Sequence, residues 1–266
     1  MTGVSTEAEA QDLILDEIQD GVAILTLNNP RRRNAVSSEL LTLLKEKLDA
    51  VAVNEEVRVV IIRAEGPVYS SGHDLKELLE GDEANNAHVF GMATIVMEAI
   101  RLLPQPVIAE VGGLATAAGC QLVASCDMAV ASEEARFATP GVRNGLFCIT
   151  PGVALARAVP KKKAMEMLLT GLPISADEAL QFGLVSRVVP AEELQERTME
   201  LAQHVSAASS YTLAIGKRSF YAQIGLDYGP AYEVAEQLMT ENMQAHDAHE
   251  GIDAFLTKRS PEWKNR

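Results

Sequence analysis

Residues 113–127 read GLATAAGCQLVASCD, in which a run of small side chains leads into a helical apolar pattern. The segment Ala117-Ala118-Gly119 allows the backbone to approach a neighbouring group closely. After it, Leu122, Val123 and Cys126 form one apolar helical face. The first amides of a helix lack intrahelical acceptors and carry partial positive charge, so they suit a developing oxyanion. The stretch therefore predicts a tight turn that leads directly into a buried helix.

A second segment, Ser70–Glu77 (SSGHDLKE), follows the strand-like run Val57–Arg63. Together these segments resemble the two signature loops of the crotonase (enoyl-CoA hydratase/isomerase) superfamily, approximately Ala-Gly-Ala-Asp-hydrophobic-Lys-Glu and Gly-x-Ala-x-Gly-Gly-Gly-x-Glu. Further landmarks stand in family order along nearly the whole chain: Leu27–Pro30 with Asn34-Ala35, Pro106–Ala109, Phe137–Pro140, Gly171–Gly183 and Phe255–Arg259. The Ala-Ala-Gly-Cys-Gln and Thr-Pro-Gly variations resemble the enoyl-CoA hydratase domain-containing protein 3 group. The resemblance implies an α/β fold with a crotonase-type ββα spiral core.

The resemblance also implies an acyl-coenzyme A thioester as ligand, with coenzyme A as part of the substrate and no covalently bound cofactor or metal. The backbone N–H groups of His73 and Ala118 would form the oxyanion hole that holds the thioester carbonyl. The other candidate substrate-binding residues are Arg31, Arg32, Arg33, Ser71, Gly72, Asp74, Lys76, Gly119, Cys148, Phe255 and Lys258. Among them the three arginines and two lysines are expected near the nucleotide, and Cys148 is expected to line the acyl pocket. A structural or solvated role is the alternative for Asp74.

Both catalytic glutamates of the family hydratases are replaced in this chain. The first aligns with Gln121 and the second, after the Phe-x-x-Pro element, aligns with Gly141. An amide does not relay protons near neutral pH, and glycine contributes only backbone. Loss of a general acid or base typically costs about 10² to 10⁴ in rate, so efficient ordinary hydration is not expected.

Three other residues are candidate replacements for these acids. The imidazole of His73 titrates near neutrality, although its side chain would point away from the ligand if the family uses only the backbone N–H there. Cys148 would need a nearby base to act as a nucleophile, and packing is the favoured interpretation. Glu110 ends an otherwise apolar strand, where a charged side chain is expected to face solvent.

Composition narrows the class of protein. The chain has 266 residues, 47% of them hydrophobic, which fits one domain or one domain with an appendage. The formal charge of −14 argues against nucleic acid as a partner. No apolar run reaches membrane-spanning length. Residues 1–12 lack secretory and transit patterns, so a mobile acidic tail and a cytoplasmic location are expected. Cys120, Cys126 and Cys148 are interpreted as buried thiols in a reducing compartment.

Strand and helix patterns alternate along the first part of the chain. Short apolar, β-branched runs predict strands at 13–18, 22–28, 57–63, 107–111, 128–132 and 185–189. Helical periodicity predicts helices at 37–53 and 87–103, and a capping box opens another at Ser175. Alternation of this kind favours parallel pairing. Together with the resemblance, this pattern implies that residues 13–190 form the spiral core. Residues 191–266 form an all-helical region, which the resemblance interprets as a trimerisation region of a homotrimer or dimer of trimers.

Three functional hypotheses follow from these features. The first is a crotonase-family enzyme whose chemistry depends mainly on oxyanion stabilisation, such as a slow hydratase, isomerase, decarboxylase or thioesterase-like activity. The second is a non-catalytic acyl-CoA binding or regulatory protein that keeps the pocket without the acids. The third is a structural subunit that pairs with an active homologue.

Overall fold

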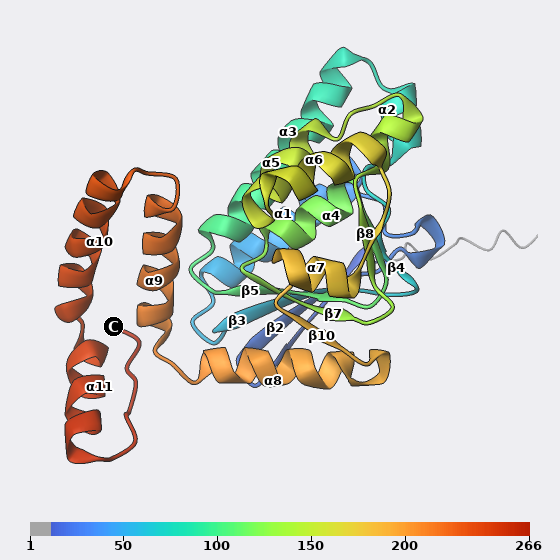
Figure 1. Ribbon diagram of the computed structural model, residues 1–266. Helices are drawn as coiled ribbons and strands as arrows, with labels where there is room; N and C mark the ends of the chain where they lie inside the picture. Colours follow the sequence, from blue (N-terminus) through green and yellow to red (C-terminus); the bar gives the residue numbers. More distant parts are fainter. Residues whose placement is uncertain (1–11) are drawn as a thin grey trace, which may run out of the picture.

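The computed structural model describes residues 12–266 (Figure 1). The predicted tail, residues 1–12, lies outside this range except for Asp12. The main sheet has six strands in the order β1-β2-β3-β5-β7-β10. Their bounds are Ile14–Gln19, Val22–Leu27, Val59–Ala64, Val107–Val111, Met128–Ser132 and Arg187–Val189. All neighbours pair in parallel except β1, which is antiparallel to β2. The predicted parallel α/β core is confirmed.

Both faces of the main sheet are covered, which explains why all six residues of β2 are buried. One face packs against α1 (Ser38–Ala52), α3 (Glu83–Leu102) and α4 (Ala118–Ser125) in the larger apolar cluster. The other face packs against α8 (Leu194–Ser206), which crosses the sheet in Figure 1. Although α8 lies in the predicted helical region 191–266, it packs on the sheet, and the division of the chain at residue 191 stays a prediction.

A second, smaller sheet has four strands in the order β4-β6-β8-β9. Their bounds are Val68–Ser70, Leu114–Thr116, Arg136–Ala138 and Ile174–Ser175. No sequence pattern predicted these strands, because two or three residues are too few to show a period. This sheet fixes the predicted turn, since β6 ends immediately before Ala117 and pairs in parallel with β4 and β8.

The predicted helices begin and end at identifiable signals. In α1 the buried stripe is Leu40, Leu41, Leu44, Leu48 and Val51, as expected. In α7 (Ala176–Phe182) the capping box of Ser175 and Glu178 is present. The remaining elements of the core are η1 (Pro30–Arg32), α2 (Leu75–Glu80), η2 (Pro140–Asn144), α5 (Ile149–Ala158), α6 (Lys161–Thr170) and η3 (Ala191–Glu193).

Three C-terminal helices, α9 (Ser210–Gln223), α10 (Tyr228–Met243) and α11 (His246–Thr257), extend to one side of the core (Figure 1). The buried ammonium of Lys217 holds α9 against the core. It lies 2.7 Å from an Asp127 carboxylate oxygen and donates to the carbonyls of Ile100 and Gln105. No residue of α10 is buried in the single chain. The three helices therefore expose a large surface that an assembly of copies would cover.

Candidate active site

The turn between β6 and α4 has an unusual backbone conformation at Ala117, with φ of 49° and ψ of −116°. A positive φ is costly for a residue with a Cβ, and such strain clusters at functional sites. Its N–H donates to the Ala138 carbonyl at 2.9 Å, and its carbonyl accepts from Gln121 N–H at 3.0 Å. The turn is thus held from both sides, and Ala118 becomes the first helical residue with its N–H outside the helical ladder.

The loop before α2 lies directly against this turn. Gly72 has φ of 86°, and a Cβ there would stand 2.7 Å from the Ala117 Cβ and 3.2 Å from the Ala118 nitrogen. Only glycine permits this approach. The bridge between Val36 and His73 uses the Gly72 carbonyl and the Asp74 N–H, which leaves the His73 N–H out of the bridge. Within residues 12–266, neither the His73 amide nor the Ala118 amide donates a hydrogen bond.

The side chain of His73 packs away from this pair of amides. Its ring meets the Phe90 ring edge-on at 5.2 Å, and its two nitrogens have no hydrogen-bond partner among the described residues. Burial lowers the pKa of His73, against the opposing effects of the nearby Val36 carbonyl and the Glu77 carboxylate. The neutral imidazole packed on α3 therefore matches the interpretation in which only the backbone of residue 73 faces the ligand.

The two positions predicted to replace the family glutamates are Gln121, which lies on α4, and Gly141, which lies in η2. Gln121 is buried, and its Oε1 has no partner among the described residues. The Gly141 N–H donates to Cys148 Sγ at 3.3 Å. A Cβ on Gly141 would stand 2.8 Å from that sulfur and 2.7 Å from the Leu146 carbonyl oxygen. Cys148 therefore occupies space that a side chain at position 141 would need.

Cys148 does not have the surroundings of a nucleophile. The thiol is buried, and burial raises its pKa, only partly offset by the hydrogen bond from the Gly141 N–H. A reactive cysteine instead needs a lowered pKa and access to solvent. The structure therefore supports packing as the role of Cys148.

Asp74 is engaged within the chain, which argues against the predicted contact with substrate. Its carboxylate caps α2 by accepting from the N–H groups of Lys76 and Glu77, and it pairs with Arg32 at 3.1 Å. Because these groups use its oxygens, the structural alternative is the better interpretation. Lys76 is different, since its side chain is 70% exposed and its nearest carboxylate, Glu80, lies 3.7 Å away. Lys76 is thus available to a ligand.

The three predicted arginines lie beside the same loop. The Arg33 carbonyl accepts from Ser71 N–H at 3.0 Å, which ties the end of η1 to the residue preceding Gly72. Asn34, fully buried, fixes the turn by donating to the carbonyls of Glu65 and Val68. The side chains of Arg31, Arg32 and Arg33 are exposed on this edge. Arg32 and the Arg33 backbone thus contact the loop that carries His73, and a role of the three arginines in substrate binding stays a prediction.

Phe255 and Lys258, both predicted to bind substrate and Lys258 to lie near the nucleotide, stand apart from this site within one chain. They stand at the end of α11, which packs against α9 and α10, well away from α4 in Figure 1. Phe255 is 82% exposed. The physical reason is that α9–α11 form their own small layer beside the core instead of folding over it.

Glu110 is buried, at 6% exposure, so the expectation that it faces solvent is wrong. Along β5, Val107, Ala109 and Val111 face α4, whereas Ile108 faces α8. Because side chains alternate along a strand, Glu110 shares the α8 face with Ile108. It lies on the opposite side of the sheet from the amide pair and does not replace the missing acids.

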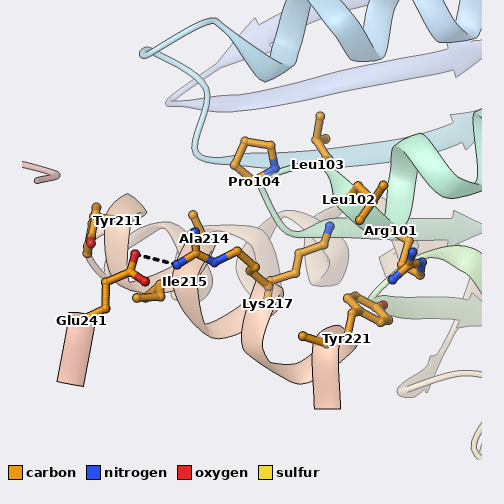
Figure 2. A pocket seen from close by; sticks show the side chains of 12 residues that line it. Arg101, Leu102, Leu103, Pro104, Tyr211, Ala214, Ile215, Lys217, Tyr221 and Glu241 are labelled. Atoms are coloured by element: carbon orange, nitrogen blue, oxygen red, sulfur yellow. Dashed lines mark hydrogen bonds and ion pairs between the residues drawn. The ribbon is translucent and has the colours of Figure 1, made fainter. Parts of the chain in front are cut away.

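A separate pocket of about 400 Å³ lies between the end of α3 and helix α9 (Figure 2). Figure 2 shows Lys217 and Tyr221 pointing from α9 toward Arg101 and Leu102. None of the predicted site residues lines this pocket. No group of three or more His, Cys, Asp or Glu side chains among residues 12–266 is placed to hold a metal ion.

Comparison with known proteins identifies the family. The sequence model described as Enoyl-CoA hydratase/isomerase matches residues 17–266. The chain belongs to this family. It is 54% identical over 247 residues to the mitochondrial enoyl-CoA hydratase domain-containing protein 3 of Homo sapiens, a match covering 92% of this chain and 82% of that protein.

Solved structures of this family share the whole fold. The crystal structure of human enoyl-CoA hydratase domain-containing protein 3 matches with a TM-score of 0.93 and 52% identity, covering 95% of this chain and 100% of that one. An enoyl-CoA hydratase from Mycobacterium smegmatis matches with a TM-score of 0.93 and 47% identity over 95% and 99% of the two chains. The predicted superfamily, its closer group and the crotonase fold are confirmed.

Two observations bear on where the protein is located in the cell. The name of the human relative places that protein in mitochondria. Across residues 12–266, no helix has the length and apolarity that crossing a membrane requires. The cytoplasmic location of this chain stays a prediction.

Proposed function

We propose that this protein binds an acyl-CoA thioester whose carbonyl oxygen accepts hydrogen bonds from the N–H groups of His73 and Ala118. The observation that carries the proposal is the pair of unpartnered amides on two loops that touch at Gly72 and Ala117. Preorganised donors of this kind stabilise negative charge that develops on a carbonyl oxygen. The membership of the enoyl-CoA hydratase/isomerase family supports the ligand class.

The chemistry of the bound thioester is limited by the groups around it. Two amide donors at the carbonyl oxygen favour an enolate at C2, but hydration also needs a base for water at C3 and an acid for C2. Gln121 can orient a water or a substrate oxygen by hydrogen bonding, without taking a proton. We therefore expect crotonyl-CoA hydration at least a few hundredfold below that of a two-glutamate homologue, since the loss of even one proton-transfer group typically costs about 10² to 10⁴ in rate.

The packing of Cys148 against Gly141 favours a second candidate, an acyl-CoA binding or regulatory protein without hydratase turnover. The sulfur fills the position from which the second acid would project, so the loop is packed as a site without that acid. Enolate-dependent reactions in which the substrate supplies its own leaving group remain compatible with the same amides.

The nucleotide would lie along the basic edge formed by Arg31, Arg33 and Lys76, whose exposed side chains offer charge-assisted hydrogen bonds to phosphates. Phe255 and Lys258 would reach a site only from another copy of the chain, because their own α11 lies apart from α4. A homotrimer or dimer of trimers, as predicted, would place the exposed faces of α10 and α11 at contacts between copies.

The oxyanion hole can be tested with two ligands that differ only in the carbonyl. Butyryl-CoA has the thioester oxygen, whereas S-butyl-CoA, a thioether, lacks it. Two hydrogen bonds of ordinary strength predict that butyryl-CoA binds about 5- to 150-fold more tightly in calorimetry. Equal affinities would show that the carbonyl does not reach the two amides.

A variant isolates one donor of the pair. Ala118→Pro removes the N–H at the first helical position, which a helix tolerates, but Ala118 is fully buried beside Gly72, so folding of the variant is measured first. If the variant melts as a folded protein, its preference for butyryl-CoA should shrink while its affinity for S-butyl-CoA stays the same. Turnover of crotonyl-CoA is measured on the same samples. Detectable turnover supports a weak enzyme, and binding without turnover supports an acyl-CoA binding protein.

A further inference from the structure

The α8 face of the main sheet contains a carboxylate without a counter-ion. Glu110 on β5 is buried among the apolar residues of this face, including Ile24, Ile61 and Ile108. No Lys, Arg or His nitrogen of residues 12–266 lies within 4.0 Å of its oxygens. A buried charge without a partner is costly, so such a carboxyl favours its neutral form unless a cation is supplied.

The groups nearest to this carboxylate are already engaged elsewhere. Arg63 on β3 donates to the Thr26 hydroxyl at 3.0 Å and pairs with Glu17 at 3.1 Å. The Thr198 hydroxyl on α8 is hydrogen-bonded with the Glu110 carboxyl and also donates to the Leu194 carbonyl at 2.7 Å. Burial raises the pKa of Glu110, and the partial effects of Arg63 and Thr198 do not overcome it. The Glu110 oxygens can therefore still accept hydrogen bonds from a bound cation.

Glu110 opens into a pocket of about 230 Å³ between the sheet and α8. The pocket has two kinds of lining. Ile24, Ile61 and Met199 supply apolar walls, while two further carboxylates, Glu17 on β1 and Glu196 on α8, stand with Arg63 around it. Because Arg63 is paired with Glu17, Glu196 and an ionised Glu110 would give the pocket a net negative charge. Its volume suits a small organic molecule with a few carbons.

We propose that this pocket binds a small aliphatic amine, with one ammonium group on Glu110 and its methylene chain against Ile24, Ile61 and Met199. A linear diamine matches the pocket best, because Glu196 offers a second carboxylate for the other ammonium group. The site lies on the opposite face of the sheet from the amide pair and is independent of the proposed acyl-CoA function. A bound ammonium would also supply the counter-ion that Glu110 lacks.

Calorimetric titration with putrescine tests the site, with butylamine and 1,4-butanediol as ligands that carry one and no ammonium group. We expect binding in the order putrescine, butylamine, butanediol. Glu110→Gln should weaken putrescine binding roughly 10- to 100-fold, the usual value of a hydrogen bond to a charged group. Glu192→Gln is the matched control, because it removes the same charge from an exposed residue of η3 outside the pocket.

Three results would overturn the proposal. Absence of putrescine binding to the wild-type protein would reject the site. If Glu110→Gln and Glu192→Gln weaken putrescine binding equally, the binding comes from general attraction by an acidic protein. Loss of putrescine binding to the wild-type protein at moderate salt would lead to the same conclusion. Melting temperatures of both variants, measured without ligand, establish that each is folded. Since none of these measurements uses acyl-CoA, their failure is separate from failure of the proposed function.

Discussion

A single methyl group at position 141 should destabilise this protein, because the structure leaves no space for it. The Cβ of Gly141→Ala would stand 2.7 Å from the Leu146 carbonyl oxygen and 2.8 Å from Cys148 Sγ. The backbone there is also tied by the Leu146 N–H, which donates to the Gly141 carbonyl at 3.0 Å. Overpacking of this kind typically costs about 1–3 kcal/mol. For a chain of this size, that corresponds to a melting temperature lowered by roughly 2–12 °C.

Two variants separate this packing effect from a general effect of alanine. Gly152→Ala on α5 is the control, because its nearest contacts are Leu168 methyl groups at 3.4 and 3.6 Å, and alanine favours a helix. It should not lower the melting temperature. Cys148→Ala combined with Gly141→Ala removes the sulfur contact and should recover part of the loss, while the Leu146 carbonyl remains in place.

The same packing governs whether the hydratase acids can be restored. Gln121→Glu is nearly isosteric, whereas Gly141→Glu meets the obstruction described above. We expect crotonyl-CoA hydration to rise most in the variant that combines both changes with Cys148→Ala, and in a non-additive way, since the two acids act as a unit. Thermal unfolding and hydration assays follow the two effects. A Gly141→Ala protein as stable as the wild type would refute the packing argument. A folded, ligand-binding triple variant without hydration would show that the pocket itself has diverged.

Further predictions follow from buried and exposed charges. Lys217→Met should lower the free energy of unfolding by about 3–5 kcal/mol in denaturant unfolding, because it leaves the Asp127 carboxylate without its cation. The control Arg218→Met, which breaks an exposed ion pair, should lower it by less than ~1 kcal/mol. Equal losses in the two variants would contradict this prediction. Lys76→Ala should weaken acyl-CoA binding in calorimetry, and more strongly at low salt. If the variant and the wild type bind acyl-CoA equally well at every salt concentration, Lys76 does not contact the phosphates. Burial raises the folded-state pKa of Glu110, so the wild type should lose stability relative to Glu110→Gln as pH rises from about 4 to neutrality. If the difference in unfolding free energy between the two proteins does not change with pH, the Glu110 carboxyl is not desolvated.

The sequence by itself determined the features that depend on local pattern. Strands 107–111 and 128–132 are found at the predicted residues, because short β-branched runs between turn residues suit a buried parallel strand. The stripe of α1 and the capping box at Ser175 follow from helical spacing and from the hydrogen bonds of a helix N-terminus. The small-residue turn before α4 was likewise legible from residue type, whereas the assignment of Gln121 and Gly141 to the family glutamates rests on the resemblance and stays a prediction.

Only the tertiary structure decided the features that depend on segments far apart in the chain. The four-stranded sheet is made of strands too short to carry a period, and pairing alone defines them. Which face Glu110 occupies depends on the strand register and on α8, which covers that face. The contact of Gly141 with Cys148 arises from loop packing, and the distance of Lys258 from the amide pair arises from how α9–α11 leave the core. Such features follow from close packing among distant residues, which a linear pattern does not encode.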